Sequence, residues 1–95
     1  MSNIVALVTG GSRGIGAATA IELAKVGVNV VINYYRHALM AEKVADKIRS
    51  HYDVDVMCVK ADISVEEEVV TMIDQVVDHF GRIDILVNNA GICND

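Results

Sequence analysis

The residues that could do chemistry in this chain are concentrated in a glycine-rich segment near the N-terminus. Residues 9–16 read T-G-G-S-R-G-I-G and follow the apolar run 4–8. A strand, a glycine turn and a helix start together make an anion site, because the first N–H groups of a helix have no partner within it and the helix dipole adds partial positive charge. Glycine lets a phosphate approach the backbone and permits the positive φ of tight turns. This pattern predicts a cradle for a nucleotide pyrophosphate.

The spacing of the glycines departs from the common dinucleotide fingerprint, G-x-G-x-x-G. Here Gly10, Gly14 and Gly16 give G-x-x-x-G-x-G, and residues 88–91, N-N-A-G, end a second apolar run. The two motifs together resemble those of the short-chain dehydrogenase/reductase family, which has T-G-x-x-x-G-x-G after its first strand and N-N-A-G after its fourth. The resemblance covers the chain from residue 4 to about residue 95.

The rest of the chain alternates apolar strands with helical segments. Strands are predicted at 4–8, 28–32, 54–61 and 83–87, and helices at 14–26, 38–51 and 64–80. This alternation predicts an α/β fold with a parallel sheet, a Rossmann-like doubly wound fold that is partial, with strand order 3-2-1-4. Ligands of such sheets bind at the carboxyl ends of the strands, where both motifs lie. We therefore expect residues 1–95 to be the N-terminal part of a single dinucleotide-binding domain, truncated after its fourth strand.

Two local features of the helices are also predicted. Five small or apolar residues suit close packing of the first helix on the sheet, namely Ala17, Ala18, Ala20, Ile21 and Ala24, and Gly27 and Gly81 are expected just past helix ends. Ser64 is predicted to cap the third helix, with Glu67 completing a capping box. Asp62 is the alternative cap, and it could also serve a ligand.

The segment after the second strand predicts which dinucleotide binds. An NAD site usually places Asp or Glu there to accept from the ribose 2′-hydroxyl, but residues 29–41 contain no acid. They contain Tyr34 and Arg36, and Arg13 lies in the glycine loop. A carboxylate would repel a 2′-phosphate, whereas guanidinium groups bind it through charge-assisted hydrogen bonds. NADP(H) is therefore favoured and NAD(H) is possible; the alternative for Arg36 is a solvated loop charge.

The resemblance assigns individual residues to the cofactor. Those of the pyrophosphate loop are Gly10, Gly11, Ser12, Arg13, Gly14, Ile15 and Gly16; those beside the adenine are Asp62 and Ile63; those beside the ribose are Asn89, Ala90 and Gly91. Alternatives remain open at this point, because Ile15 could be a core residue and the Asn pair could be a plain helix-capping turn.

The catalytic pair that the resemblance implies, a Tyr with a Lys four residues later, is not found within these 95 residues. The residues four after Tyr34, Tyr35 and Tyr52 are Ala, Leu and Val. We therefore predict no catalytic residue in this chain. The resemblance implies an NADP(H)-dependent oxidoreductase acting on a small carbonyl or alcohol, and residues 88–95 are similar to the N-N-A-G-I-T-x-D of 3-oxoacyl-[acyl-carrier-protein] reductases. A noncatalytic NADP(H)-binding module and an inactive fragment are the alternatives.

The composition of the chain restricts the classes of partner that we expect it to bind and the compartment in which we expect it. The net charge of −5 argues against nucleic acid, which binds proteins through Lys and Arg. The short N-terminal apolar run predicts neither a signal peptide nor a membrane span, and Cys58, in an apolar run, is expected to be a buried thiol in a cytoplasmic protein. His51 and His79 have no metal-ligand spacing with the cysteines. The family resemblance implies a homo-oligomer in the full-length form. The isolated chain is expected to self-associate through the apolar edge 85–87.

Overall fold

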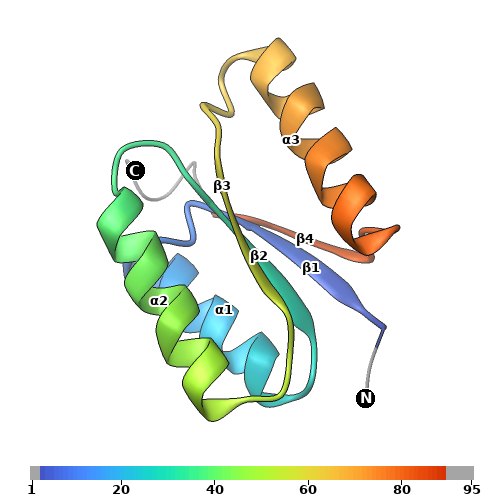
Figure 1. Ribbon diagram of the computed structural model, residues 1–95. Coiled ribbons are helices and arrows are strands. Elements are labelled where there is room, and N and C mark those ends of the chain that lie inside the picture. The colour runs from blue at the N-terminus through green and yellow to red at the C-terminus, as the bar shows by residue number, and fades with distance from the viewer. Residues whose placement is uncertain (1–2, 90–95) are drawn as a thin grey trace.

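The computed structural model describes residues 3–89, which form one four-stranded parallel sheet with three helices (Figure 1). In chain order the elements are β1 (Val5–Thr9), α1 (Gly14–Lys25), β2 (Asn29–Tyr34), α2 (Ala38–His51), β3 (Val56–Lys60), α3 (Glu66–Phe80) and β4 (Ile85–Asn88). The strand order is β3-β2-β1-β4, which confirms the predicted topology. None of these helices is long and apolar enough to cross a lipid bilayer.

β1 lies at the centre of the sheet and is buried along its whole length. It pairs with β2 from Val5↔Asn29 to Val8↔Ile32 and with β4 from Ala6↔Ile85 to Thr9↔Asn88. A parallel strand covered on both faces reads as a continuous apolar run instead of an alternating one, which is why its sequence could be identified directly.

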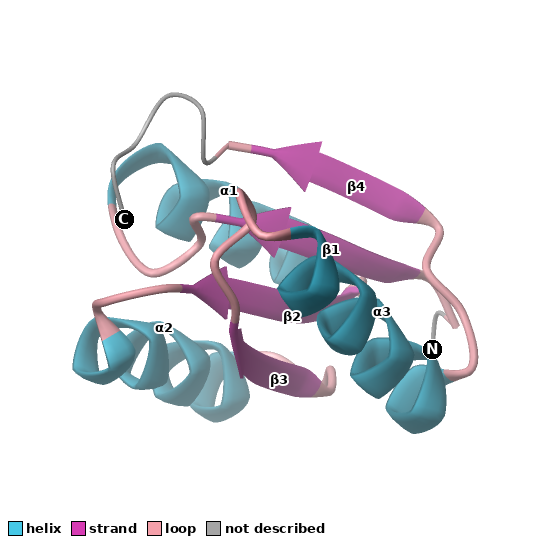
Figure 2. Ribbon diagram, turned by 90° about the horizontal axis from the view of Figure 1, so that it is seen from above, coloured by secondary structure: helices cyan, strands magenta, loops and turns pink. Residues whose placement is uncertain are grey.

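The helices cover opposite faces of the sheet, α1 and α2 on one side and α3 on the other (Figures 1 and 2). Two cores result. The core under α1 and α2 consists of Val8, Ala20, Ala24, Val30, Ile32, Ala41, Ala45, Ile48 and Val56. The core under α3 consists of Val5, Leu7, Val31, Val59, Ala61, Met72 and Val76. Alanines supply all but one of the helical residues of the first core, so α1 and α2 can approach the strands closely.

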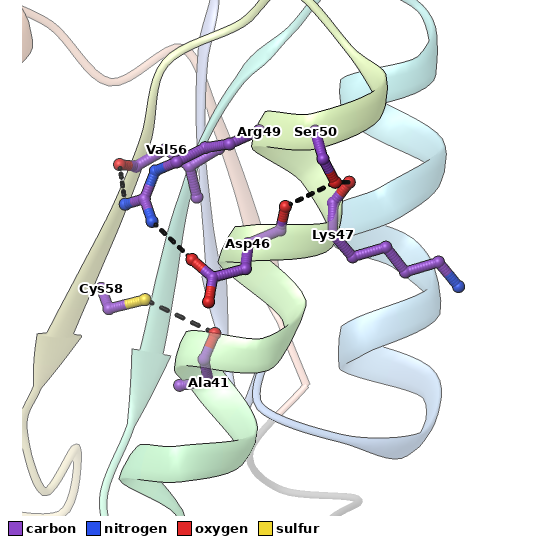
Figure 3. A network of polar contacts seen from close by, with 7 residues as sticks. All are labelled: Ala41, Asp46, Lys47, Arg49, Ser50, Val56 and Cys58. Carbon is purple, nitrogen blue, oxygen red and sulfur yellow. Dashed lines mark hydrogen bonds and ion pairs between the residues drawn. The ribbon is translucent and has the colours of Figure 1, made fainter.

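β3 forms one edge of the sheet, and α2 protects it (Figure 3). Arg49 donates from Nη2 to the Val56 carbonyl at 3.1 Å and pairs with Asp46 at 3.3 Å. Since unpaired edge groups invite pairing with other chains, this guanidinium protects the edge. Cys58, beside it on β3, donates from Sγ to the Ala41 carbonyl at 3.6 Å. Cys58 is half-buried, so the expected buried thiol is found only in part, because an edge strand leaves one side open.

The predicted helix ends are confirmed where glycine determines them. Gly27 and Gly81 have φ of 91° and 82°, a conformation that other residues adopt only at a cost. The predicted cap of α3 is wrong: the helix starts at Glu66, its N-cap position is Val65, and no described side chain caps it. The prediction for Ala18 is also wrong, because this side chain is exposed, whereas Ala20 and Ala24 are buried.

Candidate functional site

The glycine loop leaves the carboxyl end of β1 and turns directly into α1 (Figure 2). Gly10 and Gly14 have φ of 62° and 59°. Arg13 is the N-cap of α1, and no side chain within residues 3–89 caps this helix end. The first intrahelical bond runs from Ala17 N–H to the Arg13 carbonyl, so the amides before it have no partner along the helix. This arrangement leaves the positive end of α1 available to an anion.

Gly16 brings the two motifs together. A Cβ at this position would lie 2.1 Å from the Gly10 carbonyl oxygen and 2.8 Å from Nδ2 of Asn89. Both distances are below any real contact of a Cβ atom, so only glycine fits. The first turn of α1 therefore packs directly on the backbone of the loop and on the side chain that follows β4. The structure thus brings Gly10, Gly16 and Asn89 to one point.

Thr9 fastens the ends of β1 and β4 to one another, a role that the sequence reasoning missed. Its hydroxyl oxygen accepts the Asn89 N–H at 2.9 Å. The hydroxyl proton faces two acceptors, the Val87 carbonyl at 3.2 Å and Oδ1 of Asn88 at 3.1 Å. Because these bonds span about 80 residues of sequence, no local pattern could have revealed them.

Asn33 is the second residue that was missed. Its side chain is buried at the end of β2. Oδ1 accepts the Gly10 N–H at 3.3 Å, and Nδ2 donates to the Ala61 carbonyl at 3.1 Å. The available signal was a polar residue at the end of an apolar strand.

Ser12 lies in the loop with only 1% of its surface exposed. Its hydroxyl is the one buried side-chain polar group among residues 3–89 that has no hydrogen-bond partner. Buried polar groups in proteins are almost always paired, so an orphaned hydroxyl needs an explanation. Arg13 and Ile15, close by, are exposed, Ile15 to 59%, and the alternative that Ile15 is a core residue is therefore wrong.

The ends of β2 and β3 lie beside each other, since Ala61 N–H bonds the Tyr34 carbonyl at 2.9 Å. Tyr34 is half-buried against the core under α1 and α2. Arg36 is exposed, with its guanidinium 5.4 Å from the ring centre of Tyr35. This position is compatible both with a solvated loop charge and with a ligand contact.

Asp62 caps the turn before α3. Its Oδ1 accepts from Ser64 Oγ at 2.7 Å and from Ser64 N–H at 3.0 Å, and its own N–H donates to Glu68 at 2.8 Å. These two bonds from Ser64 and, to a lesser degree, the Arg36 charge hold the pKa of Asp62 below its ordinary value. The alternative that Asp62 caps α3 is therefore wrong, because its bonds to Ser64 and Glu68 close the preceding turn and the N-cap position of the helix is Val65.

Ile63, Ala90 and Gly91 are the other residues that the sequence assigns to the cofactor, and a metal site is the other kind of site considered. Ile63 is partly buried against the core under α3. Ala90 and Gly91 lie outside the described residues. No group of three or more His, Cys, Asp or Glu suited to a metal ion occurs between residues 3 and 89. His51 and His79 are exposed, and His79 pairs with Asp55 at 2.9 Å.

Known proteins match this chain over nearly its whole length. Residues 4–95 match the short chain dehydrogenase family. Versicolorin reductase 1 of Dothistroma septosporum is 50% identical over 88 residues, which are 93% of this chain and 33% of that protein. The 3-oxoacyl-[acyl-carrier-protein] reductase FabG of Staphylococcus aureus is 47% identical over 90 residues, which are 95% of this chain and 36% of that protein.

Solved structures of dehydrogenases also match this chain. The crystal structure of a short chain dehydrogenase from Burkholderia cenocepacia in complex with NADP has a TM-score of 0.86 at 41% identity, and the match covers 92% of this chain and 35% of that one. An alcohol dehydrogenase from the archaeon Thermococcus sibiricus, complexed with 5-hydroxy-NADP, has a TM-score of 0.82 at 34% identity, covering 87% and 35%. The chain spans about a third of the length of these relatives. From the match over residues 4–95, the two motifs and the shared sheet, it follows that this chain belongs to the short chain dehydrogenase family.

Proposed function

We propose that residues 1–95 are the N-terminal part of a single dinucleotide-binding domain in an NADP(H)-dependent oxidoreductase, which reduces a small carbonyl compound or oxidises the corresponding alcohol. The observation that carries this proposal is the buried Ser12 hydroxyl, which has no partner in a loop that also leaves the start of α1 uncapped. A phosphorylated ligand supplies the acceptors that both the hydroxyl and the amides need.

Each part of the site has a proposed role toward the dinucleotide. The backbone amides of residues 14–16 bind the pyrophosphate, and Asp62 with Ile63 holds the adenine. The residues 89–91 lie beside the ribose. Bound NADP(H) would supply the hydride for carbonyl reduction or accept it in alcohol oxidation, and the residues at the carboxyl ends of β1 and β4 would hold the dinucleotide.

NADP(H) is favoured over NAD(H) because no acid occurs in residues 29–41 and because Arg13 and Arg36 stand at the two loops that would flank a 2′-phosphate. The solved relatives that carry NADP or 5-hydroxy-NADP support this preference.

Arg13→Glu tests the proposal by isothermal titration of the full-length protein with NADPH and NADH. Losing a charge-assisted hydrogen bond costs about 1.5–3 kcal/mol, which is roughly 10- to 150-fold in affinity, and the loss should fall on NADPH. Lys25→Glu is the matched control, because it makes the same charge change at the far end of α1. Equal weakening of NADPH and NADH by Arg13→Glu would show that Arg13 does not read the 2′-phosphate.

A noncatalytic NADP(H)-binding module is the second candidate. It differs from the enzyme in lacking a Tyr-x-x-x-Lys pair, which none of the three tyrosines in residues 1–95 begins. Proton transfer needs a donor within hydrogen-bond reach of the substrate, so this polypeptide alone should not turn over. Reading the gene beyond codon 95 decides between the two, because a Tyr-x-x-x-Lys supports the enzyme and its absence supports the module.

The substrate and the setting of the full protein are proposals as well. The 47% identity to a 3-oxoacyl-[acyl-carrier-protein] reductase favours a ketone as the group reduced. Cys58 is a free thiol, which favours a reducing, cytoplasmic compartment. We propose a homo-oligomer, which sizing of the full-length protein would test.

A further inference from the structure

We propose that Asn33 is a positioning residue that fixes the distance between the pyrophosphate loop, residues 10–16, and the loop after β3 that carries Asp62. In this way it determines the affinity for the adenosine half of the cofactor without contacting it. This inference rests on the proposed function. The Asn33 side chain is buried and both of its polar ends already bond the protein, Oδ1 the Gly10 N–H and Nδ2 the Ala61 carbonyl, which leaves neither for a ligand.

The carboxamide of Asn33 spans three strands at their carboxyl ends. On the β1 side, Oδ1 accepts the Gly10 N–H at 3.3 Å, and the backbone carbonyl of Asn33 accepts the Gly11 N–H at 3.0 Å. On the β3 side, Nδ2 donates to the Ala61 carbonyl at 3.1 Å. Two longer contacts, to the carbonyls of Tyr34 and Val59 at 3.4 Å, share the remaining N–H of the amide.

The bonds of Asn33 begin where the sheet stops. The paired register of β1 and β2 ends at Val8↔Ile32, so the glycine loop has no further strand to pair with. The side chain and carbonyl of Asn33 take over this task for the first two residues of the loop. On the other side, Ala61 directly precedes Asp62, the proposed adenine residue.

Only a side chain with both a donor and an acceptor can make this connection. An amide has two N–H donors and a carbonyl acceptor, whereas leucine has neither. Serine has one hydroxyl on a short stem and cannot reach Gly10 and Ala61 together. Since Asn33 is buried, an amide or carbonyl that loses its partner there is shielded from bulk solvent and pays the cost of an unpaired buried group.

The test measures binding of NADPH and of 2′,5′-ADP to the full-length protein by calorimetry. This second probe carries the adenosine half alone. We expect Asn33→Leu and the milder Asn33→Ser to weaken 2′,5′-ADP by roughly 5- to 100-fold, the loss that follows from one unpartnered buried group. Hydrogen exchange of the Gly10 amide in the ligand-free protein should accelerate in both variants, while that of Val31 in mid-strand stays protected.

Val76→Ala is the control for instability. Val76 is a residue of α3, fully buried in the core between this helix and the sheet, and its apolar side chain bonds neither loop. This variant should therefore lower the free energy of unfolding and leave 2′,5′-ADP affinity within about twofold. If Asn33→Leu does not fold, Asn33→Ser alone gives the answer. Wild-type affinity in a folded Asn33 variant, or a loss no larger than that of Val76→Ala, overturns this inference alone. Failure of the wild-type protein to bind either probe overturns the proposed function and this inference with it.

Discussion

Gly16→Ala is the substitution that most directly tests how the site is built. The added Cβ would stand 2.1 Å from the Gly10 carbonyl oxygen, and 2.8 Å from both the Gly10 carbonyl carbon and Nδ2 of Asn89. The carbonyl would have to retreat by about 0.9 Å to reach the 3.0 Å that real Cβ atoms keep. Gly10 cannot retreat freely, because its own N–H is held by Asn33 and its φ is 62°.

The magnitude follows from two opposing effects. Alanine gains about 1 kcal/mol over glycine inside a helix. A clash against backbone lies at or above the upper end of the roughly 1–3 kcal/mol that overpacking costs. The expected net loss is therefore about 2 kcal/mol in the free energy of unfolding. Displacement of Gly10 and Asn89 together should also weaken NADPH at least about tenfold, since both belong to the proposed site.

Urea unfolding and NADPH calorimetry of the full-length protein measure the two effects. Gly81→Ala is the control, because it has a φ of 82° and nothing within 4 Å of its Cβ. It should cost about 1–2 kcal/mol through the left-handed backbone alone and leave NADPH affinity unchanged. A Gly16→Ala protein with wild-type stability and affinity would refute the close packing of α1 on the loop.

Three further predictions concern other parts of the chain. The Arg82 guanidinium and then the Val5 amide hold the pKa of Asp84 below its usual 3.8, so the stability that this carboxylate adds is complete above about pH 4 and is lost as the pH falls through the lowered pKa. Asp84→Asn should therefore have a lower free energy of unfolding at pH 7, and that free energy should fall less between about pH 5 and pH 2 than it does in the wild type. If urea titrations show the same fall over this pH range in both proteins, the prediction is contradicted. Burial, followed by the nearby carboxylates, raises the pKa of Cys58 to about 11. In the folded protein at pH 8, iodoacetamide should therefore alkylate this thiol far more slowly than free cysteine, as measured by mass spectrometry of the peptide that contains it. An equal rate would rule this out. A polypeptide of residues 1–95 made alone should self-associate on sizing, because Leu86 on the edge strand β4 is 64% exposed, and Leu86→Lys should reduce the association; a sharp melt of a clean wild-type monomer would argue against it.

The central strands β1 and β2 could be predicted most clearly from the sequence, because they are buried on both faces. Their centres are apolar runs, and their predicted bounds differ from the observed ones by no more than two residues. Glycine marked two helix ends for a clear physical reason, its positive φ. The start of α3 was harder to predict from the sequence. Several residues near Ser64 can accept a hydrogen bond from a backbone N–H, and only their positions in space decide which of them does.

The site was predictable where it consists of backbone and not where it depends on long-range side-chain bonds. The glycine spacing identified the loop, and the contact of Gly16 with Asn89 unites the two motifs. The bonds of Thr9 and Asn33 could not be foreseen. Both side chains connect strands that are distant in sequence, and a periodicity argument covers only neighbours along the chain.

The neighbours of β1 have a consequence for how the protein is made. β2 follows β1 within about 25 residues, but β4, which completes its other side, comes nearly 80 residues later. At about 5–20 residues per second, a ribosome needs roughly 4–16 s to cover that interval. During this time the nascent chain carries a half-finished sheet whose central strand exposes one ladder of amides and carbonyls. Chaperone binding during synthesis should therefore concentrate on the chain before β4 emerges.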